Sequence, residues 1–256
     1  MNLIKRVLFK IFGLKNYLKI ISSFFFMMYK AGLLKGKPLF DHHYFVGKLI
    51  EKGDYIIDIG ANLGYYSVLF AGLTGKNGKV YSVEPVKPYR EVLERNTRKF
   101  GNVEIIPYAL GTENNKTVRM GIPDGNKYFS HGRTQVMDEE FESKFTFEVT
   151  VMNPKQVFGS LKKLDYIKCD IEGYEGIVIP EMMPVISKFL PLLQIETSGD
   201  AKEKITGLLS ELGYKTYNLV ESRLIPESEN KAKPFGDIFY IPEKRLDRLS
   251  KEIFKK

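Results

Sequence analysis

The chain has little cysteine and no tryptophan. Its 256 residues include one cysteine, Cys169, which excludes an internal disulfide and gives no cysteine-based metal cluster. We therefore expect a reducing compartment and a cytoplasmic protein. Repeats and low-complexity segments are also absent, and 43% of the residues are hydrophobic. This composition predicts one α/β domain with an appendage.

Acidic residues are absent from residues 1–40, a segment that holds 8 of the 39 lysines and arginines. The remaining 31 basic residues are balanced by 31 acids, so the net charge of +8 belongs to this N-terminal arm. An enzyme that acts on nucleic acid would carry its positive charge along the catalytic groove. We therefore expect no nucleic-acid partner.

The arm also lacks an apolar run long enough to span a membrane and a small-residue cleavage site of the secretory type. Apolar residues instead recur every three or four positions, which predicts one stripe of a basic amphipathic helix. Such a helix, over residues 3–28, either lies in an anionic membrane interface or packs on the catalytic domain or a partner subunit. The stripe comprises Ile4, Val7, Ile11, Leu14, Leu18, Ile21 and Phe25.

A run of small residues between two predicted strands is the most informative pattern in the chain. Residues 55–59 predict an apolar strand that leads into Gly60-Ala-Asn-Leu-Gly64 and a helix-like stretch. Residues 79–83 predict a second strand, which ends at Glu84. Glycines allow the backbone to approach a ligand closely, and Glu84 offers two acceptor oxygens to two adjacent ribose hydroxyls. This pairing predicts a nucleoside-cofactor pocket.

Asp58, directly before this turn, distinguishes between cofactors. A dinucleotide site usually reads G-x-G-x-x-G and binds a pyrophosphate, which Asp58 would repel. The same acid suits the ammonium of S-adenosylmethionine, which we therefore expect in place of NAD. The alternative is that Asp58 only caps a helix and the glycines only make a turn. The predicted cofactor-binding residues are Asp58, Gly60, Ala61, Asn62, Gly64 and Glu84, with Ala109 at the adenine edge and Asp170 at the end of a later strand.

Two acids follow the predicted buried strand at residues 164–169. Asp170 and Glu172 lie just past its end, where side chains face the ligand crevice of an open parallel sheet. Burying both carboxylates without a use would be costly. We predict that one of them is the catalytic base that takes a proton from an acceptor hydroxyl, with His131 and His42 as alternatives.

A metal-assisted variant would use the same acids. Asp170, Glu172 and Glu196 end neighbouring predicted strands and are hard oxygen ligands for magnesium or calcium, which would lower the pKa of a bound hydroxyl. The alternative is that Glu172 and Glu175 only favour the start of a helix. The divalent metal is the less favoured variant, so no metal ligand is assigned.

Residues 112–151 change in character and predict a β-rich insertion. Insertions at the carboxyl ends of the strands commonly shape a substrate site, so His131 and Arg133 are candidates for substrate contacts. His42 and His43, in a predicted helix before the first strand, are candidates for the same reason. The alternative for each of them is an ordinary surface or capping residue.

Four motifs together resemble the FkbM-type family of S-adenosylmethionine-dependent methyltransferases. They read D-I-G-A-N-L-G-Y-Y-S, V-E-P, Y-I-K-C-D-I-E-G-Y-E and L-L-Q-I-E-T. The likeness spans residues 40–241 and implies a Rossmann-like, doubly wound, mostly parallel seven-stranded sheet. One departure is Met152-Asn-Pro154, where the family often has Thr-Leu-Asp. We therefore do not infer the identity of the methyl acceptor from that of any relative.

The resemblance implies transfer of a methyl group to a hydroxyl of a sugar, glycan, glycolipid or polyketide. Together with the charge and spacing of the two ends, it predicts a basic helical arm (residues 1–39), a methyltransferase domain (40–242) and a charged helical tail (243–256). An oligomer and a peripheral position on the inner face of a membrane are further expectations. Two alternatives stay open: a nicotinamide-dependent oxidoreductase, and a non-catalytic protein that binds S-adenosylmethionine at a membrane.

Overall fold

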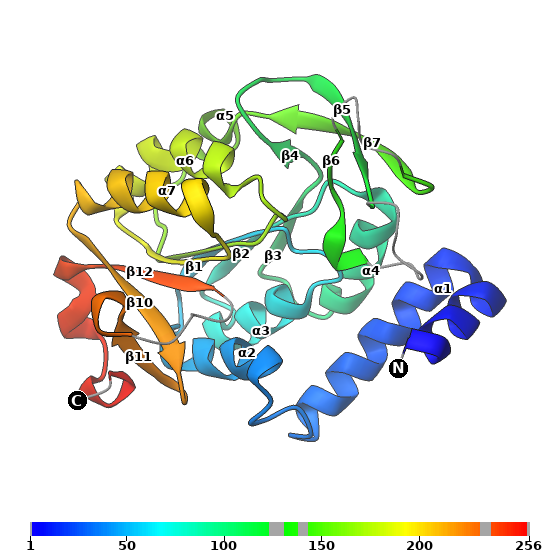
Figure 1. Cartoon of the computed structure of the whole chain (residues 1–256), viewed down its shortest axis with the longest axis horizontal. Helices are drawn as coiled ribbons and strands as arrows, with labels where there is room; N and C mark the ends of the chain where they lie inside the picture. The colour runs from blue at the N-terminus through cyan, green and yellow to red at the C-terminus, as the bar shows by residue number, and fades with distance from the viewer. Residues whose placement is uncertain (1, 123–130, 138–142, 231–236, 255–256) are drawn as a thin grey trace.

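The computed structural model describes residues 2–122, 131–137, 143–230 and 237–254, with only the backbone path at 2–6 and 131. Its centre is a sheet of eight strands within the described residues, in the order β11-β10-β12-β9-β8-β1-β2-β3. The five strands from β9 to β3 run parallel, and the other three pair antiparallel at one edge (Figure 1). The strands are β1 (Tyr55–Ile59), β2 (Lys79–Val83), β3 (Val103–Ile106), β8 (Tyr166–Cys169), β9 (Leu192–Ile195), β10 (Tyr214–Val220), β11 (Arg223–Pro226) and β12 (Ile238–Pro242).

The predicted Rossmann-like sheet is confirmed, with one strand more than the seven expected. The extra strand, β11, forms a hairpin with β10 at the sheet edge. Its turn is made by Glu221 and Ser222, whose φ angles are 50° and 60°. Tight hairpin turns with two positive φ angles normally contain Asn-Gly or Asp-Gly, so this turn has no recognisable sequence signal.

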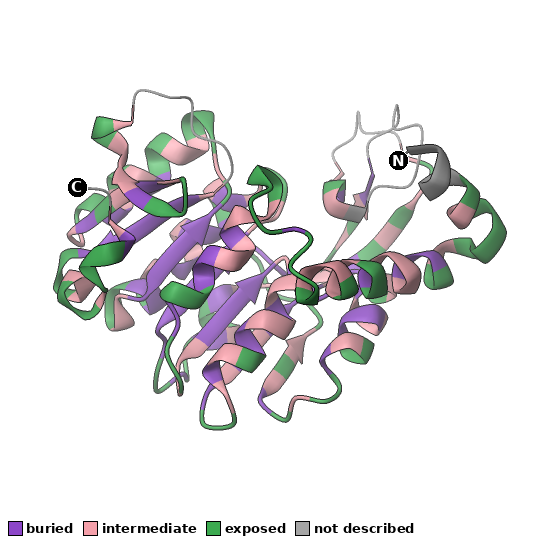
Figure 2. Ribbon diagram, turned by 90° about the horizontal axis from the view of Figure 1, so that it is seen from below, coloured by how far each residue is buried: buried purple, intermediate pink, exposed green. Residues whose placement is uncertain are grey.

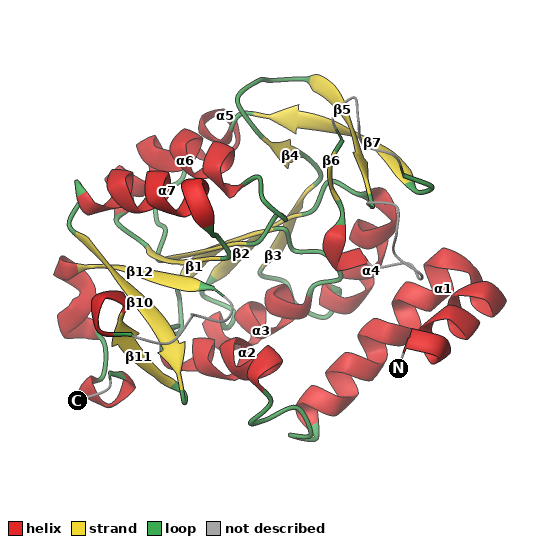
Figure 3. Ribbon diagram, in the orientation of Figure 1, coloured by secondary structure: helices red, strands yellow, loops and turns green. Residues whose placement is uncertain are grey.

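Helices cover both faces of the sheet, as in a doubly wound fold. One buried cluster joins the strands to α5, α6 and α7, and a second joins them to α2 and α3. Figure 3 shows α5–α7 on one side of the sheet and α2 and α3 on the other. The strands themselves form the most buried layer (Figure 2). The helices are α2 (Asp41–Phe45), α3 (Tyr65–Thr74), α4 (Lys87–Thr97), α5 (Pro154–Phe158), α6 (Glu175–Phe189) and α7 (Gly199–Ser210).

The β-rich insertion forms a second sheet of four strands within the described residues, in the order β4-β7-β5-β6. It lies next to α4, with which it shares a buried cluster. A short 3-10 helix, η3 (His131–Arg133), comes before β6 in the chain, and β6 is an edge strand of this sheet. The strands are β4 (Ala109–Leu110), β5 (Lys116–Gly121), β6 (Gln135–Val136) and β7 (Thr146–Met152).

The N-terminal arm is the helix α1 (Asn2–Lys30), which is kinked at Gly13, where φ is +64°. Beyond the kink, the predicted apolar stripe packs on the catalytic domain, and Leu18 is fully buried. Before the kink, Val7 and Ile11 are exposed. The packing alternative thus describes the second half of the stripe. No helix among the described residues is long and apolar enough to cross a membrane.

The C-terminal tail consists of two 3-10 helices, η5 (Glu243–Arg248) and η6 (Lys251–Ile253). Ile253 is buried, and the Arg245 guanidinium donates to the carbonyl oxygens of Leu164 and Phe189 at 3.3 and 3.0 Å. The tail is therefore anchored against the rest of the fold through Arg245 and Ile253. Three further 3-10 helices are η1 (Pro38–Phe40), η2 (Val46–Lys48) and η4 (Glu227–Glu229).

Candidate active site

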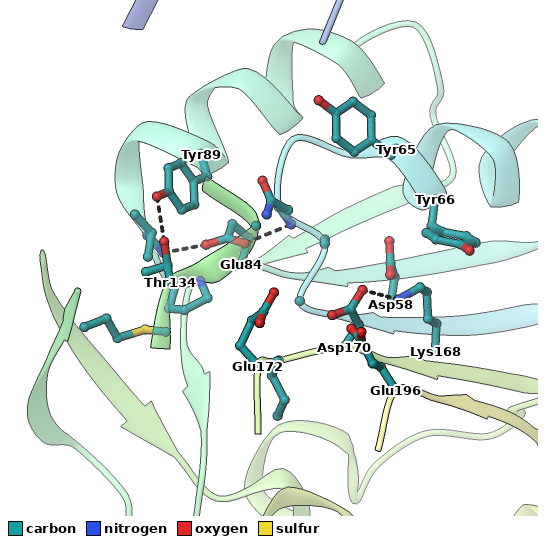
Figure 4. Close-up of a pocket in the computed structure, with 18 of the residues that line it drawn as sticks. Asp58, Tyr65, Tyr66, Glu84, Tyr89, Thr134, Lys168, Asp170, Glu172 and Glu196 are labelled. Atoms are coloured by element: carbon teal, nitrogen blue, oxygen red, sulfur yellow. Dashed lines mark hydrogen bonds and ion pairs between the residues drawn. The ribbon is translucent and has the colours of Figure 1, made fainter. Parts of the chain in front are cut away.

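A hollow of about 250 Å³ opens at the carboxyl ends of β1, β2 and β8, between the main sheet and the insertion. This is the edge at which ligands bind in open α/β sheets. Figure 4 shows carboxylates from several elements converging on it. Its lining residues include Asp58, Gly60, Ala61, Asn62, Glu84, Asp170 and Glu172 from the predicted set, together with His43, Tyr65, Tyr66, Val86, Tyr89, Met120, Gly132, Thr134, Lys168 and Glu196.

Glu84 follows β2 and lies in the hollow beside Gly60, as the prediction requires. Its Oε2 accepts the Asn62 N–H at 2.9 Å and its Oε1 accepts the Val86 N–H at 2.8 Å. These bonds fix the carboxylate and leave each oxygen with a further acceptor site. Burial raises the pKa of Glu84 to about 7. Two adjacent hydroxyls are ligands that match this arrangement.

Asp58, in β1, is 1% exposed and lines the same hollow. The Ser67 hydroxyl donates to its Oδ2 at 2.6 Å, and Ser82 donates to Ser67 at 2.8 Å. Burial raises the pKa of Asp58 to about 6, against the opposing effect of Lys168. A ligand ammonium next to this carboxylate would favour its ionised form.

Glycine at position 60 is required by the protein backbone. Gly60 has φ +82°, and a Cβ there would lie 1.9 Å from the carbonyl oxygen of Asp170. Two other predicted cofactor residues do not line the hollow. A Cβ at Gly64 would lie 2.8 Å from Leu93, so this glycine lets α3 approach α4, and Ala109 is buried in the second sheet. Both residues have packing roles in the structure, and their contacts with the cofactor stay a prediction.

Asp170, just past β8, is held by two neighbours. The ammonium of Lys168 lies 2.8 Å from its Oδ2, and Glu196 hydrogen-bonds to it. Burial alone would raise the pKa of Asp170, but Lys168 and Glu196 hold it below the usual value. The hydrogen bond to Asp170, with burial, raises the pKa of Glu196 to about 9. At neutral pH, the pair therefore carries one proton, on Glu196.

Glu172 points into the hollow from the turn after β8 (Figure 4). Its φ of 55° lies in the left-handed region, which non-glycine residues rarely adopt. Burial and the charge of Asp170 raise the pKa of Glu172 to about 7. A carboxylate with this pKa is suited to accept a proton at neutral pH.

The predicted histidines lie in different places. His42 is buried and stacks on Phe239 at 5.7 Å, outside the lining of the hollow. His43 lines the hollow, and its ring stacks on Tyr66 at 4.1 Å. Burial lowers the pKa of His43 to about 3, so its imidazole stays neutral. Its Nδ1 is buried without a hydrogen-bond partner among the described residues.

The candidates in the insertion are only partly described. His131 begins η3, but its side chain lies outside the described part of the chain. Arg133 is exposed, whereas its neighbours Gly132 and Thr134 line the hollow. The insertion therefore contributes Gly132 and Thr134 to the lining of the hollow, whereas substrate contacts of His131 and Arg133 stay a prediction.

Lys168 was missed at the sequence level. It is 2% exposed, and its ammonium lies 4.6 Å from the ring centre of Tyr66. A lone lysine in the apolar run Tyr166-Ile-Lys-Cys was the available signal, because a buried charge needs a partner. Tyr65 and Tyr66 also line the hollow. Both belong to the motif D-I-G-A-N-L-G-Y-Y-S, but their position in a predicted helix gave them no predicted role in the site.

The acids do not form a metal site in the part of the chain that the structure describes. No group of three or more His, Cys, Asp or Glu residues there could hold a metal ion. Asp170 instead pairs with Lys168.

The lining residues fit S-adenosylmethionine. Asp58 matches its ammonium, and Glu84 has free acceptor sites for two ribose hydroxyls. Val86, Tyr89 and Met120 give the hollow largely apolar walls that suit a purine ring. A doubly wound sheet with this hollow defines a protein of the nucleoside-cofactor class.

A family model of the methyltransferase FkbM domain matches residues 58–216. The chain thus belongs to the FkbM methyltransferase family, which confirms the resemblance seen in the motifs.

Two curated relatives match shorter segments of the chain. The chain is 34% identical over 85 residues to a probable cobalt-precorrin-6B C(15)-methyltransferase (decarboxylating) from Saccharolobus solfataricus, which covers 30% of this chain and 43% of the relative. It is 34% identical over 59 residues to a protein-L-isoaspartate O-methyltransferase from Methanococcus aeolicus, covering 22% and 27%. The chain thus spans less than half the length of either relative.

Among solved structures, a methyltransferase FkbM from Methylobacillus flagellatus KT is similar with a TM-score of 0.49 and 17% identity. The alignment covers 82% of this chain and 52% of that one.

Proposed function

We propose that this protein transfers a methyl group from S-adenosylmethionine to a hydroxyl of a sugar, glycan or glycolipid. Family membership supports methyl transfer. The observation that supports the hydroxyl is the charge state of the groups next to Asp170. S-adenosylmethionine supplies an activated methyl group, so the protein has to orient the acceptor and remove its proton.

The site favours a neutral acceptor. Lys168, the one cation that lines the hollow within the described residues, is already paired with Asp170. A carboxylate acceptor would therefore find no unpaired cation among the described lining residues to replace its lost hydration. An ammonium acceptor gains little, because Glu196 holds a proton at neutral pH and Asp170 is neutralised by Lys168.

Glu172 is the proposed catalytic base. Its pKa of about 7 matches the operating pH, whereas Asp170 is held in its ionised form by Lys168 and Glu196 and is a weaker base. The roles predicted for the two acids therefore differ: Glu172 accepts the proton, and Asp170 positions the acceptor. His43, with its neutral ring and buried Nδ1, is the proposed hydrogen-bond partner of the acceptor.

A second hollow gives room for an acceptor larger than one sugar. It has a volume of about 510 Å³, shares Glu172 and Glu196 with the first, and extends towards the start of α7. Its polar lining includes Thr197, Ser198 and Lys202. These hydroxyl and ammonium groups, with the carboxyl groups of Glu172 and Glu196, suit a polyhydroxylated ligand, since each can form hydrogen bonds with sugar hydroxyls.

The test is a comparison of cell-envelope glycans and lipids from cells with and without the protein, by mass spectrometry. We expect a difference of one methyl group on a glycan or glycolipid, and transfer of labelled methyl from S-adenosylmethionine to the same acceptor by purified protein. Labelling of an amine or carboxyl acceptor would contradict the hydroxyl assignment. Binding of NAD in preference to S-adenosylmethionine would favour an oxidoreductase, and tight binding of S-adenosylmethionine without transfer would favour a non-catalytic protein.

A further inference from the structure

Two adjoining hollows lie on the outer side of α1 and α4 and share no lining residue with the candidate active site. The first has a volume of about 400 Å³ and the second about 190 Å³, and Arg95 lines both. Together they form one surface, which we call the basic–apolar face. The first is lined by Lys19, Ile20, Ser23, Phe24, Met27 and Arg95, and the second by Phe26, Lys30, Val68, Arg95, Asn96, Arg98 and Lys99.

The charge of this face has one sign. Its cations come from two elements far apart in the sequence, and no acid lines either hollow within the described residues. Lysines and arginines that converge in this way attract an anionic surface. The cations are Lys19 and Lys30 of α1, Arg95 of α4, and Arg98 and Lys99 just after α4.

Large apolar side chains project among these cations. Phe24 is 56% exposed and Met27 is 57% exposed. They lie on the side of α1 opposite Leu18 and Phe25, which belong to the predicted stripe and pack inward. The outward face is therefore a different set of residues from the stripe.

The face is held in place by contacts between α1 and α4. The Arg95 guanidinium donates to the Ser23 hydroxyl at 3.1 Å and to the Lys19 carbonyl oxygen at 3.4 Å. Lys15 forms an ion pair with Glu91 at 2.6 Å. Figure 1 shows α1 lying alongside α4 at the border of the molecule, where none of the other described helices and strands covers its outer side.

We propose that the basic–apolar face docks on an anionic lipid bilayer. Phe24 and Met27 enter the interfacial region, and the surrounding cations lie at the level of the lipid phosphates. Exposed apolar side chains gain nothing from a soluble polyanion, whereas a bilayer offers both an apolar layer and anionic headgroups. That combination favours a membrane over a nucleic acid or an acidic protein.

Docking here would bring the membrane near the active site. Phe25, on the inner side of the same helix, contacts Tyr65 with ring centres 4.3 Å apart, and Tyr65 lines the hollow. The docking face does not depend on the proposed acceptor, because it needs neither the cofactor nor methyl transfer.

The test is flotation of the full-length protein with lipid vesicles, without acceptor. We expect the protein to float with vesicles that contain phosphatidylglycerol and not with pure phosphatidylcholine. The double variant Arg98→Gln/Lys99→Gln should lower the partition coefficient about 25-fold, at about fivefold for each cation removed. The matched control, Lys162→Gln/Lys244→Gln, removes two exposed lysines elsewhere and should partition like the wild type.

A second pair of variants tests the apolar component. Phe24→Ser/Met27→Ser should reduce flotation with anionic vesicles, whereas Ile177→Ser, at a residue 38% exposed on α6, should not. Circular dichroism and S-adenosylmethionine binding report whether each variant is folded. The proposal is overturned if the wild type does not float with anionic vesicles, or if both double variants bind like the wild type. Displacement of the protein from anionic vesicles by a short oligonucleotide would instead identify the face as a nucleic-acid surface.

Discussion

Replacing Glu84 by glutamine tests the cofactor site at the contact on which it depends. Each carboxylate oxygen accepts one backbone N–H, from Asn62 or Val86, and keeps one acceptor site for a ligand hydroxyl. Glutamine has the same shape but one acceptor oxygen, so at least one hydroxyl bond is lost. A hydrogen bond to a charged group contributes about 1.5–3 kcal/mol. We therefore expect Glu84→Gln to weaken S-adenosylmethionine binding about 10- to 150-fold.

Isothermal titration calorimetry gives the dissociation constants of wild type and variant. The control is Glu104→Gln, which makes the same chemical change in β3 at an exposed acid paired with Lys79. Its affinity should equal that of the wild type, and circular dichroism should show that both variants are folded. Unchanged affinity in Glu84→Gln would refute the assignment of this carboxylate to the ribose.

Three further predictions concern pH, the buried lysine and the backbone. Because burial raises the pKa of Glu84 from 4.5 to about 7, S-adenosylmethionine affinity should fall by up to about tenfold per pH unit below 7, as calorimetry across pH would show. The stability of the unliganded protein should fall as pH rises from 4.5 through 7, because the folded state holds that proton more tightly. Lys168→Met should slow methyl transfer about 100-fold and move the acidic limb of the pH–rate profile upward, because the ammonium that lowers the pKa of the proposed base Glu172 is lost; a superimposable profile would contradict its role. Gly60→Ala should lower the free energy of unfolding by at least about 3 kcal/mol in urea denaturation, whereas Gly72→Ala, inside α3 with open space, should raise it by up to about 1 kcal/mol; equal effects would contradict the backbone argument.

The parallel core of the fold could be predicted because its signals are local. Short apolar runs bounded by turn residues marked the strands β1, β2 and β8, which carry Asp58, Glu84 and Asp170 at or just past their carboxyl ends. The hairpin strand β11 could not be predicted, because Glu221 and Ser222 take positive φ angles without glycine or asparagine. The β-rich insertion could be predicted because residues 112–151 differ in pattern from the segments around them. Its position close to Glu84 could not be predicted, because sequence patterns do not give the packing of one sheet against another.

In the candidate site, too, the local motifs could be predicted and the contacts between distant segments could not. The turn at Gly60 and the acids at the strand ends lie within single motifs, so the sequence alone determined that a nucleoside cofactor and carboxylates share one edge of a sheet. Only the tertiary structure decided what each group does there. Lys168 favours the ionised form of Asp170. Glu196, which follows the neighbouring strand β9, forms a hydrogen bond with the same carboxylate.

The arm follows the same rule. The apolar residues of the arm recur every three or four positions within one continuous segment. The sequence alone therefore determined that an amphipathic basic helix forms. Which side of that helix remains exposed depends on the surface it packs against, and Leu18 and Phe25 turned inward because α3 and α4 offered an apolar partner. Periodicity along a chain fixes a stripe, whereas the identity of its partner is a property of contacts between residues far apart in the sequence.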